Sequence, residues 1–152
     1  MENGSKYEGL MLKNQLCFPV YACSRMIIKR YGPMLRELEL TYTQYIVMMV
    51  LWETRQVSMK ELGARLYLDS GTLTPVIRSL EEKGLAAKER DPADERSVNV
   101  TLSGKGLELR EKAADIPAQM ASCVKLEPDE AASLYGLLYK LLGSIPAEEH
   151  SL

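Results

Sequence analysis

Hydrophobic positions recur at helical spacing near the start of the chain. From residue 12 to residue 30 an apolar side chain returns every three or four positions, which predicts an amphipathic helix. The Gly32-Pro33 pair is expected to end it, and residues 35–40 to form a short second helix. The apolar positions of the first helix are Leu12, Leu16, Val20, Cys23 and Ile27.

Residues 43–54 are apolar almost all round, which distinguishes them from the amphipathic segments. Thr41 and Gln44 have the spacing of a capping box, in which each side chain binds the other's backbone N–H at a helix start. We therefore expect a helix over residues 43–54 at the centre of the hydrophobic core.

Two further helices should follow in quick succession. Ser58 and Glu61 form a second capping-box pattern, which opens a short helix over residues 59–66. After a three-residue turn, residues 70–83 make another helix, which Gly84 ends. This order is that of a helix-turn-helix, in which the second helix reads DNA.

A short β-ribbon comes next in the pattern. Residues 86–90 and 97–102 are predicted as strands, joined by a charged turn that contains Pro92, which cannot extend a strand ladder. The sequence thus predicts a mainly α fold with a small β-wing, and a winged helix-turn-helix over residues 43–102.

The remaining helices lie after the wing. Ser103 should cap a helix that runs past Ile116, and Pro117 should kink or interrupt it. Pro128 marks the start of an amphipathic final helix that ends near Gly143.

Both ends of the chain carry apolar helices without a core of their own. We interpret residues 10–40 and 103–145 as dimerisation helices within a single chain spanning residues 1–152. A symmetric homodimer would present two recognition helices to successive major grooves of a pseudo-palindromic double-stranded DNA site, about 34 Å apart.

The start of the recognition helix carries the candidate DNA contacts. Small hydroxyl side chains and Gly71 allow a close approach to a duplex, although Ser70 or Asp69 must also cap the helix. The net charge of −2 gives no general attraction to DNA, so binding depends on locally placed basic residues. The candidates are Ser70, Thr72, Thr74 and Arg78, with Lys60, Arg65, Lys88, Arg90 and Arg96 as supporting charges.

Composition excludes several other functions. No apolar run is long enough to span a bilayer, and the first residues lack a signal-peptide pattern, so a cytoplasmic protein without membrane association is expected. Three cysteines without a CxxC motif and a single histidine, His150, predict neither a metal site nor a bound cofactor. Triad-type catalysis lacks its base, so we do not expect an enzyme.

Several short motifs together indicate one family of regulators. They are Lys13-Asn14-Gln15-Leu16-Cys17-Phe18, Tyr21-Ala22, Tyr31, Leu40-Thr41-Tyr42-Thr43-Gln44-Tyr45, Leu51-Trp52-Glu53, the run from Leu66 to Pro75, and Asp94-Glu95-Arg96-Ser97. With them the chain resembles the MarR family of winged-helix repressors over roughly residues 10–145. Cys17 with its tyrosines makes it most similar to the branch that senses organic hydroperoxides.

The resemblance implies roles for individual residues. Cys17 would be the thiol that peroxide oxidises, and the hydroxyls of Tyr31 and Tyr42 would hydrogen-bond its thiolate. Arg96 would enter a minor groove, braced by Asp94. Tyr21 follows Cys17 by four positions and either contacts the sulfur or only packs beside it.

Helix geometry adds a constraint on this site. Tyr31 lies 14 positions after Cys17, which is roughly 21 Å along a helix at about 1.5 Å per residue. Tyr31 cannot touch Cys17 within its own subunit unless the helix breaks, whereas in an antiparallel dimer the Tyr31 of the other subunit could reach it. The sensing site is then expected to span the dimer.

Two thiols are candidates for resolving the oxidised Cys17, and the sequence does not decide between them. Cys23 points elsewhere on the same helix as Cys17, beyond disulfide reach, and is interpreted as structural. Cys123 could form the disulfide, as in one subclass of the family, or a low-molecular-weight thiol could form a mixed disulfide, as in the other.

The sequence therefore predicts a homodimeric repressor that releases its operator when an organic hydroperoxide oxidises Cys17. Two alternatives remain: a winged-helix repressor gated by a phenolic ligand, and, from a different class, a thiol peroxidase.

Overall fold

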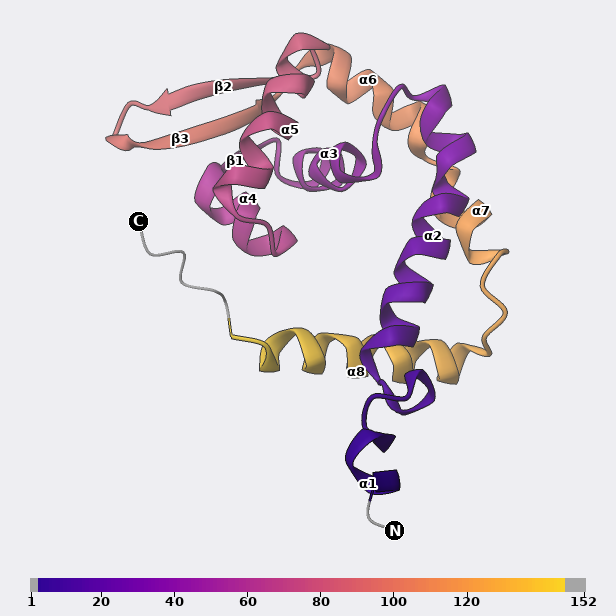
Figure 1. Ribbon diagram of the computed structural model, residues 1–152. Helices are drawn as coiled ribbons and strands as arrows, with labels where there is room; N and C mark the ends of the chain where they lie inside the picture. The colour runs from indigo at the N-terminus through magenta and orange to yellow at the C-terminus, as the bar shows by residue number, and fades with distance from the viewer. Residues whose placement is uncertain (1–2, 147–152) are drawn as a thin grey trace. The chain divides into compact units, whose positions relative to one another are not determined.

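The structure, a computed structural model, describes residues 3–146 and contains two compact units, one ending at Pro117 and one beginning at Ala118. The first unit holds a three-stranded antiparallel sheet among helices, and the second is helical. Figure 1 shows the long hairpin of the sheet projecting from the helices of the first unit. The predicted fold class, mainly α with a small β-wing, is confirmed.

The first long helix begins later than predicted. After α1 (Asn3–Glu8) and a short 3-10 helix (Leu12–Asn14), α2 runs over Cys17–Glu37. Its start fits Pro19, because a proline in the first turn has no N–H that needs a helical partner. Cys17 is therefore the first residue of α2.

The same helix also ends later than predicted. Gly32-Pro33 does not stop it, and the expected second helix over residues 35–40 is instead its last turn and the connection to α3. A proline inside a helix costs about 3 kcal/mol. Burial of three leucines just beyond it offsets that cost, because each leucine contributes about 1.5–3 kcal/mol when fully buried. They are Leu35, Leu38 and Leu40.

Helix α3 (Tyr42–Thr54) lies at the centre of the core, as predicted. Its capping box is complete: the backbone N of Gln44 donates to Oγ1 of Thr41 over 3.2 Å, and Oε1 of Gln44 accepts from the backbone N of Thr41 over 3.0 Å. Among the apolar side chains of α3, Met49 is the exposed one, with 45% of its surface accessible.

The next helix, α4 (Met59–Leu66), has the predicted bounds but only half of the predicted capping box. Oγ of Ser58 accepts from the backbone N of Glu61 over 3.1 Å. The Glu61 carboxylate instead binds Arg65 one turn later, at 2.7 Å. Tyr67 then takes the left-handed conformation that ends the helix.

The recognition helix α5 spans Ser70–Glu82. Asp69 is its cap, because its Oδ1 accepts from the backbone N of Thr72 over 2.7 Å. Its buried face packs into the core through Leu73, Ile77 and Leu80, which leaves the other face of the helix outside the core.

The sheet has the order β1-β3-β2 and contains one strand that the pattern missed. This strand, β1 (Gln56–Ser58), is too short to show alternation, and it forms because buried Val57 pairs with Val100. The hairpin of β2 (Ala86–Asp91) and β3 (Asp94–Leu102) is longer than predicted. The expected wide turn is therefore only Pro92-Ala93.

After the wing come α6 (Gly104–Ala113) and α7 (Ile116–Ala121). The predicted interruption falls before Pro117, because this proline has no N–H to bind the carbonyl of Ala113 and the helix ends there. Gly106 is packed so closely that a Cβ would lie 2.2 Å from the Leu85 carbonyl oxygen. Its own carbonyl accepts from Nε1 of Trp52 over 2.8 Å.

In the second unit, α8 (Pro128–Ser144) begins and ends within a residue of the prediction. The backbone N of Glu127 donates to the Glu130 carboxylate over 2.9 Å and closes its first turn. Between residues 3 and 146, no helix is long and apolar enough to cross a membrane.

Candidate DNA interface and redox site

An open groove lies between the helix-turn-helix and the wing. It has a volume of about 610 Å³ and is lined by residues of α4, α5, β2 and β3. Four of the predicted DNA-contacting residues line it: Ser70, Thr74, Asp94 and Arg96. The fold therefore brings the start of the recognition helix and the wing arginine to one concave surface.

Two other candidates on the recognition helix lie outside this groove. Thr72 completes the helix cap, since its Oγ1 donates to the second oxygen of Asp69 over 3.2 Å. Nε of Arg78 donates to Glu82 over 3.1 Å, and both side chains are exposed. Exposed pairs of this kind contribute little to stability, so Arg78 can exchange Glu82 for another anion at small cost.

The groove has a positive lining. Lys60 and Lys88 line it together with Arg96, whereas Asp94 is its acidic residue. Arg65, another supporting charge from the sequence, is held by Glu61 at 2.7 Å and by Glu53 at 3.7 Å. Lys60, Lys88 and Arg96 thus give the groove a positive lining despite the net negative charge of the chain, whereas Arg65, Arg78 and Arg90 are not part of it.

Two hydrogen bonds between residues two positions apart hold the tip of the wing. The backbone N of Ala93 donates to Asp91 over 2.9 Å, and the backbone N of Arg96 donates to Oδ1 of Asp94 over 3.0 Å. Asp94 thus braces the backbone of Arg96, which fixes where its side chain leaves the strand.

Cys17 is exposed at the first turn of α2. Tyr21 lies one turn further along, and its ring centroid is 5.4 Å from the guanidinium carbon of Arg25. Because α2 is unbroken from Cys17 to Tyr31, the 14 positions between them separate the two residues by roughly 21 Å along the helix axis, at about 1.5 Å per residue. Cys23 is also exposed on this helix.

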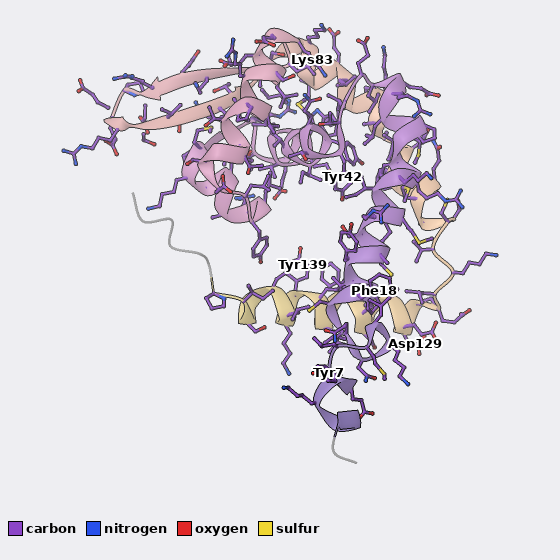
Figure 2. All side chains as sticks on the ribbon, viewed as in Figure 1. Tyr7, Phe18, Tyr42, Lys83, Asp129 and Tyr139 are labelled. Carbon is purple, nitrogen blue, oxygen red and sulfur yellow. The ribbon has the colours of Figure 1, made fainter. Side chains whose placement is uncertain are left out.

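Three tyrosines gather where α2 meets α3, at the end of α2 that lies away from Cys17. The ring centroids of Tyr31 and Tyr42 are 5.0 Å apart, and those of Tyr31 and Tyr45 are 5.8 Å apart. Tyr45 also meets Trp52 edge-on at 6.2 Å. Figure 2 shows Tyr42 between the two helices. We call Tyr31, Tyr42 and Tyr45 the tyrosine cluster.

Sequence reasoning missed Tyr45, although its position three residues after Tyr42 on a helix was a usable signal. Burial raises the pKa of all three phenols above the ordinary value, and the neighbouring Tyr42 raises that of Tyr31 further. The phenols therefore stay neutral at physiological pH and keep the O–H group that a thiolate would need as a donor.

Cys123 belongs to the second unit, just after α7. Its Sγ lies 3.5 Å from the carbonyl oxygen of Gln119, and the side chain is exposed. Like Cys17, it is a free thiol.

Each unit leaves apolar side chains uncovered on one helix. Leu16, Phe18, Val20, Tyr21, Met26, Ile27 and Ile28 are exposed on or next to α2 in the first unit. Leu134, Tyr135, Leu137, Leu138, Tyr139, Leu141 and Leu142 are exposed on α8 in the second. Exposed apolar faces of this extent mark interaction surfaces.

Known proteins share this architecture. The family described as transcriptional regulator SarA/Rot matches residues 29–113. The organic hydroperoxide resistance transcriptional regulator of Bacillus subtilis (strain 168) is 43% identical over 145 residues, which cover 95% of this chain and 97% of the relative.

Solved structures of AbfR from Staphylococcus epidermidis are also similar. Reduced AbfR bound to DNA is 32% identical with a TM-score of 0.75, covering 91% of this chain and 96% of that one. The disulfide form of AbfR is 33% identical with a TM-score of 0.63, covering 91% and 97%.

The fold and the groove define a winged helix-turn-helix regulator of transcription. The chain belongs to the SarA/Rot regulators, which are winged-helix proteins of the MarR type, and to the branch of organic hydroperoxide resistance regulators. The resemblance drawn from its motifs is confirmed.

Proposed function

We propose that this chain is a homodimeric DNA-binding repressor that senses organic hydroperoxides by oxidation of Cys17. The observation that carries the proposal is the placement of a free, exposed thiol at the first turn of α2, on the same unbroken helix as Tyr31 of the tyrosine cluster. In an antiparallel dimer each thiol would meet the Tyr31 and Tyr42 hydroxyls of the other subunit. The thiol would thus lie at the subunit interface, where its chemistry can move the subunits.

The uncovered faces of α2 and α8 support dimerisation through residues 10–40 and 103–145. The winged helix-turn-helix over residues 43–102 would then face DNA twice, once from each subunit. Ser70, Thr74, Lys88 and Arg96 would contact DNA from the groove of each subunit, and Thr72 and Arg78 from outside it. A repressor of this kind acts on the chromosome, so we expect it in the cytoplasm.

The sensing step consumes one peroxide per thiol. The Cys17 thiolate attacks a peroxide oxygen, the O–O bond breaks and an S–O bond forms. The sulfur becomes a sulfenic acid, and the alkoxide leaves with a proton as the alcohol. A second thiol then attacks the sulfur and water departs, which leaves a disulfide. The second thiol is Cys123 or a low-molecular-weight thiol.

Oxidation would first remove the thiolate that the phenols bind. The disulfide then holds the helices in an arrangement that no longer spaces the two recognition helices for successive grooves. AbfR has been solved bound to DNA in a reduced form and in an overoxidized form, and also in a disulfide form, which supports a two-state account in which the disulfide marks the released state.

The test uses a duplex that the reduced protein selects from a random pool. One equivalent of cumene hydroperoxide per Cys17, with a small thiol present, should weaken binding of the labelled duplex by about 5–150-fold, the range typical of allosteric coupling. Mass spectrometry of the same sample identifies the partner of Cys17. An unchanged affinity would contradict the proposal, and continuous consumption of peroxide beyond one equivalent per thiol would favour a thiol peroxidase.

A further inference from the structure

Gln44 is the buried polar side chain in the part of the chain that the structure describes, with 5% of its surface exposed. It sits in the first turn of α3, but its amide group also reaches the recognition helix. Nε2 donates to Oγ of Ser79 on α5 over 2.9 Å, while Oε1 accepts from the backbone N of Thr41 over 3.0 Å. A buried amide that joins two helices holds them in register, because breaking either bond leaves a desolvated polar atom.

Lys83 makes the second connection between the same elements. It follows directly after α5, and its Nζ donates to Oε1 of Gln44 over 3.0 Å. The same ammonium group donates to the carbonyl oxygen of Glu39, a left-handed residue in the turn between α2 and α3. Figure 2 shows Lys83 at this end of the first unit. One charged group thus ties the end of the recognition helix to the α2–α3 turn.

The tyrosine cluster borders this network. Tyr42 and Tyr45 flank Gln44 on α3, and Tyr31 packs against both from the last turns of α2. A displacement of these rings would therefore act on the first turn of α3 and on the α2–α3 turn. Those two segments are the ones that Ser79 and Lys83 bind.

We propose that Gln44, Ser79 and Lys83 are positioning residues that couple the tyrosine cluster to the recognition helix. The inference rests on the proposed function, since it assigns the connection through which the thiol controls DNA binding. Without this connection α5 would still be anchored in the core by Leu73, Ile77 and Leu80. Its position would then no longer depend on that of the tyrosine rings.

A purely structural role predicts a different result. If the network only stabilised the fold, its loss would weaken DNA binding of the reduced and the oxidised protein alike. If it couples the two sites, its loss changes the ratio of the two affinities, because that ratio measures the coupling free energy. The ratio of dissociation constants, oxidised over reduced, is therefore the quantity to measure.

The variant Lys83→Met removes both ammonium hydrogen bonds and keeps a side chain of similar length. Lys105→Met is its matched control: Nζ of Lys105 donates to the carbonyl oxygen of Lys83 over 2.8 Å, so it holds the same helix end but does not bind Gln44 or Glu39. Both substitutions remove one positive charge. Ser79→Ala is a smaller change that removes the hydrogen bond from Gln44. It serves as a second test variant if Lys83→Met folds poorly.

We expect the ratio in Lys83→Met and Ser79→Ala to fall at least about five-fold below that of the parent protein, while Lys105→Met keeps it. The rate at which Cys17 is oxidised by cumene hydroperoxide should be the same in all four proteins. Ratios in Lys83→Met and Ser79→Ala within two-fold of the parent, or an equal fall in Lys105→Met, would overturn the inference. A parent protein whose affinity does not change on oxidation would instead refute the proposed function.

Discussion

A Cys17→Ser protein should remain on its DNA in the presence of an organic hydroperoxide that releases the parent protein. A serine hydroxyl can accept and donate hydrogen bonds at the same place but cannot be oxidised to a sulfenic acid. The parent is expected to lose about 5–150-fold in affinity, equivalent to about 1–3 kcal/mol, and the variant none. Fluorescence anisotropy of a labelled duplex, before and after one equivalent of cumene hydroperoxide, gives both values.

The other two cysteines provide the controls for this experiment. Cys23→Ser should respond like the parent protein. Cys123→Ser separates the two resolving routes, because loss of its response in the absence of a small thiol, with recovery on adding one, would identify Cys123 as the resolving residue. If cumene hydroperoxide still released the Cys17→Ser protein from DNA, the thiol mechanism would be contradicted.

That outcome would favour the alternative hypothesis, a repressor whose DNA binding is controlled by a phenolic ligand. An apolar cavity between α3 and α6 has a volume of about 160 Å³ and is lined in part by Tyr45, Met49 and Trp52. This volume is below the roughly 300–1,000 Å³ typical of ligand pockets. This cavity is therefore small for such a ligand.

Replacing Arg96 by alanine should weaken DNA binding by about 1–3 kcal/mol, or roughly 5–150-fold, in the reduced protein. Arg96 lines the groove together with the start of the recognition helix, and Asp94 fixes the backbone from which its side chain extends. Equilibrium titration at a fixed salt concentration measures the effect, because the phosphate contribution to affinity changes steeply with salt.

Arg110→Ala is a suitable control for the wing variant. It removes the same charge from an exposed side chain on α6, which lies outside the groove, and its contact with Glu111 at 3.8 Å is weak. We expect its affinity to stay within about two-fold of the parent, since surface substitutions away from a site are usually within about 0.5 kcal/mol. Equal losses in both variants would mean that Arg96 contributes only to net charge.

The sequence predicted the helix-turn-helix well because its boundaries are set by local chemistry. The hydroxyls of Thr41 and Ser58 accept the predicted backbone hydrogen bonds, and Asp69 caps the recognition helix as one of two candidates. Such caps depend on residues three positions apart, so they are visible in the chain itself.

Features that depend on distant partners were not predictable in this way. Pro33 stays inside α2 because leucines beyond it are buried by other elements, and β1 exists only through its pairing with β3. The hydrogen bond between Gln44 and Ser79 joins residues 35 positions apart, and no local pattern announces it. Tertiary contacts overrode local propensity at each of these places.

The central claim is that Cys17 of one subunit works with the phenols of the other. Mixed dimers of a Cys17→Ser subunit and a Tyr31→Phe/Tyr42→Phe subunit test it, with a sulfenic-acid-specific nucleophile to report the oxidation rate. The single Cys17 of such a dimer shares its chain with phenylalanines and faces intact tyrosines across the interface. The account requires it to react at the parent rate, faster than Cys17 in the Tyr31→Phe/Tyr42→Phe homodimer. A rate equal to that of the slow homodimer would contradict it.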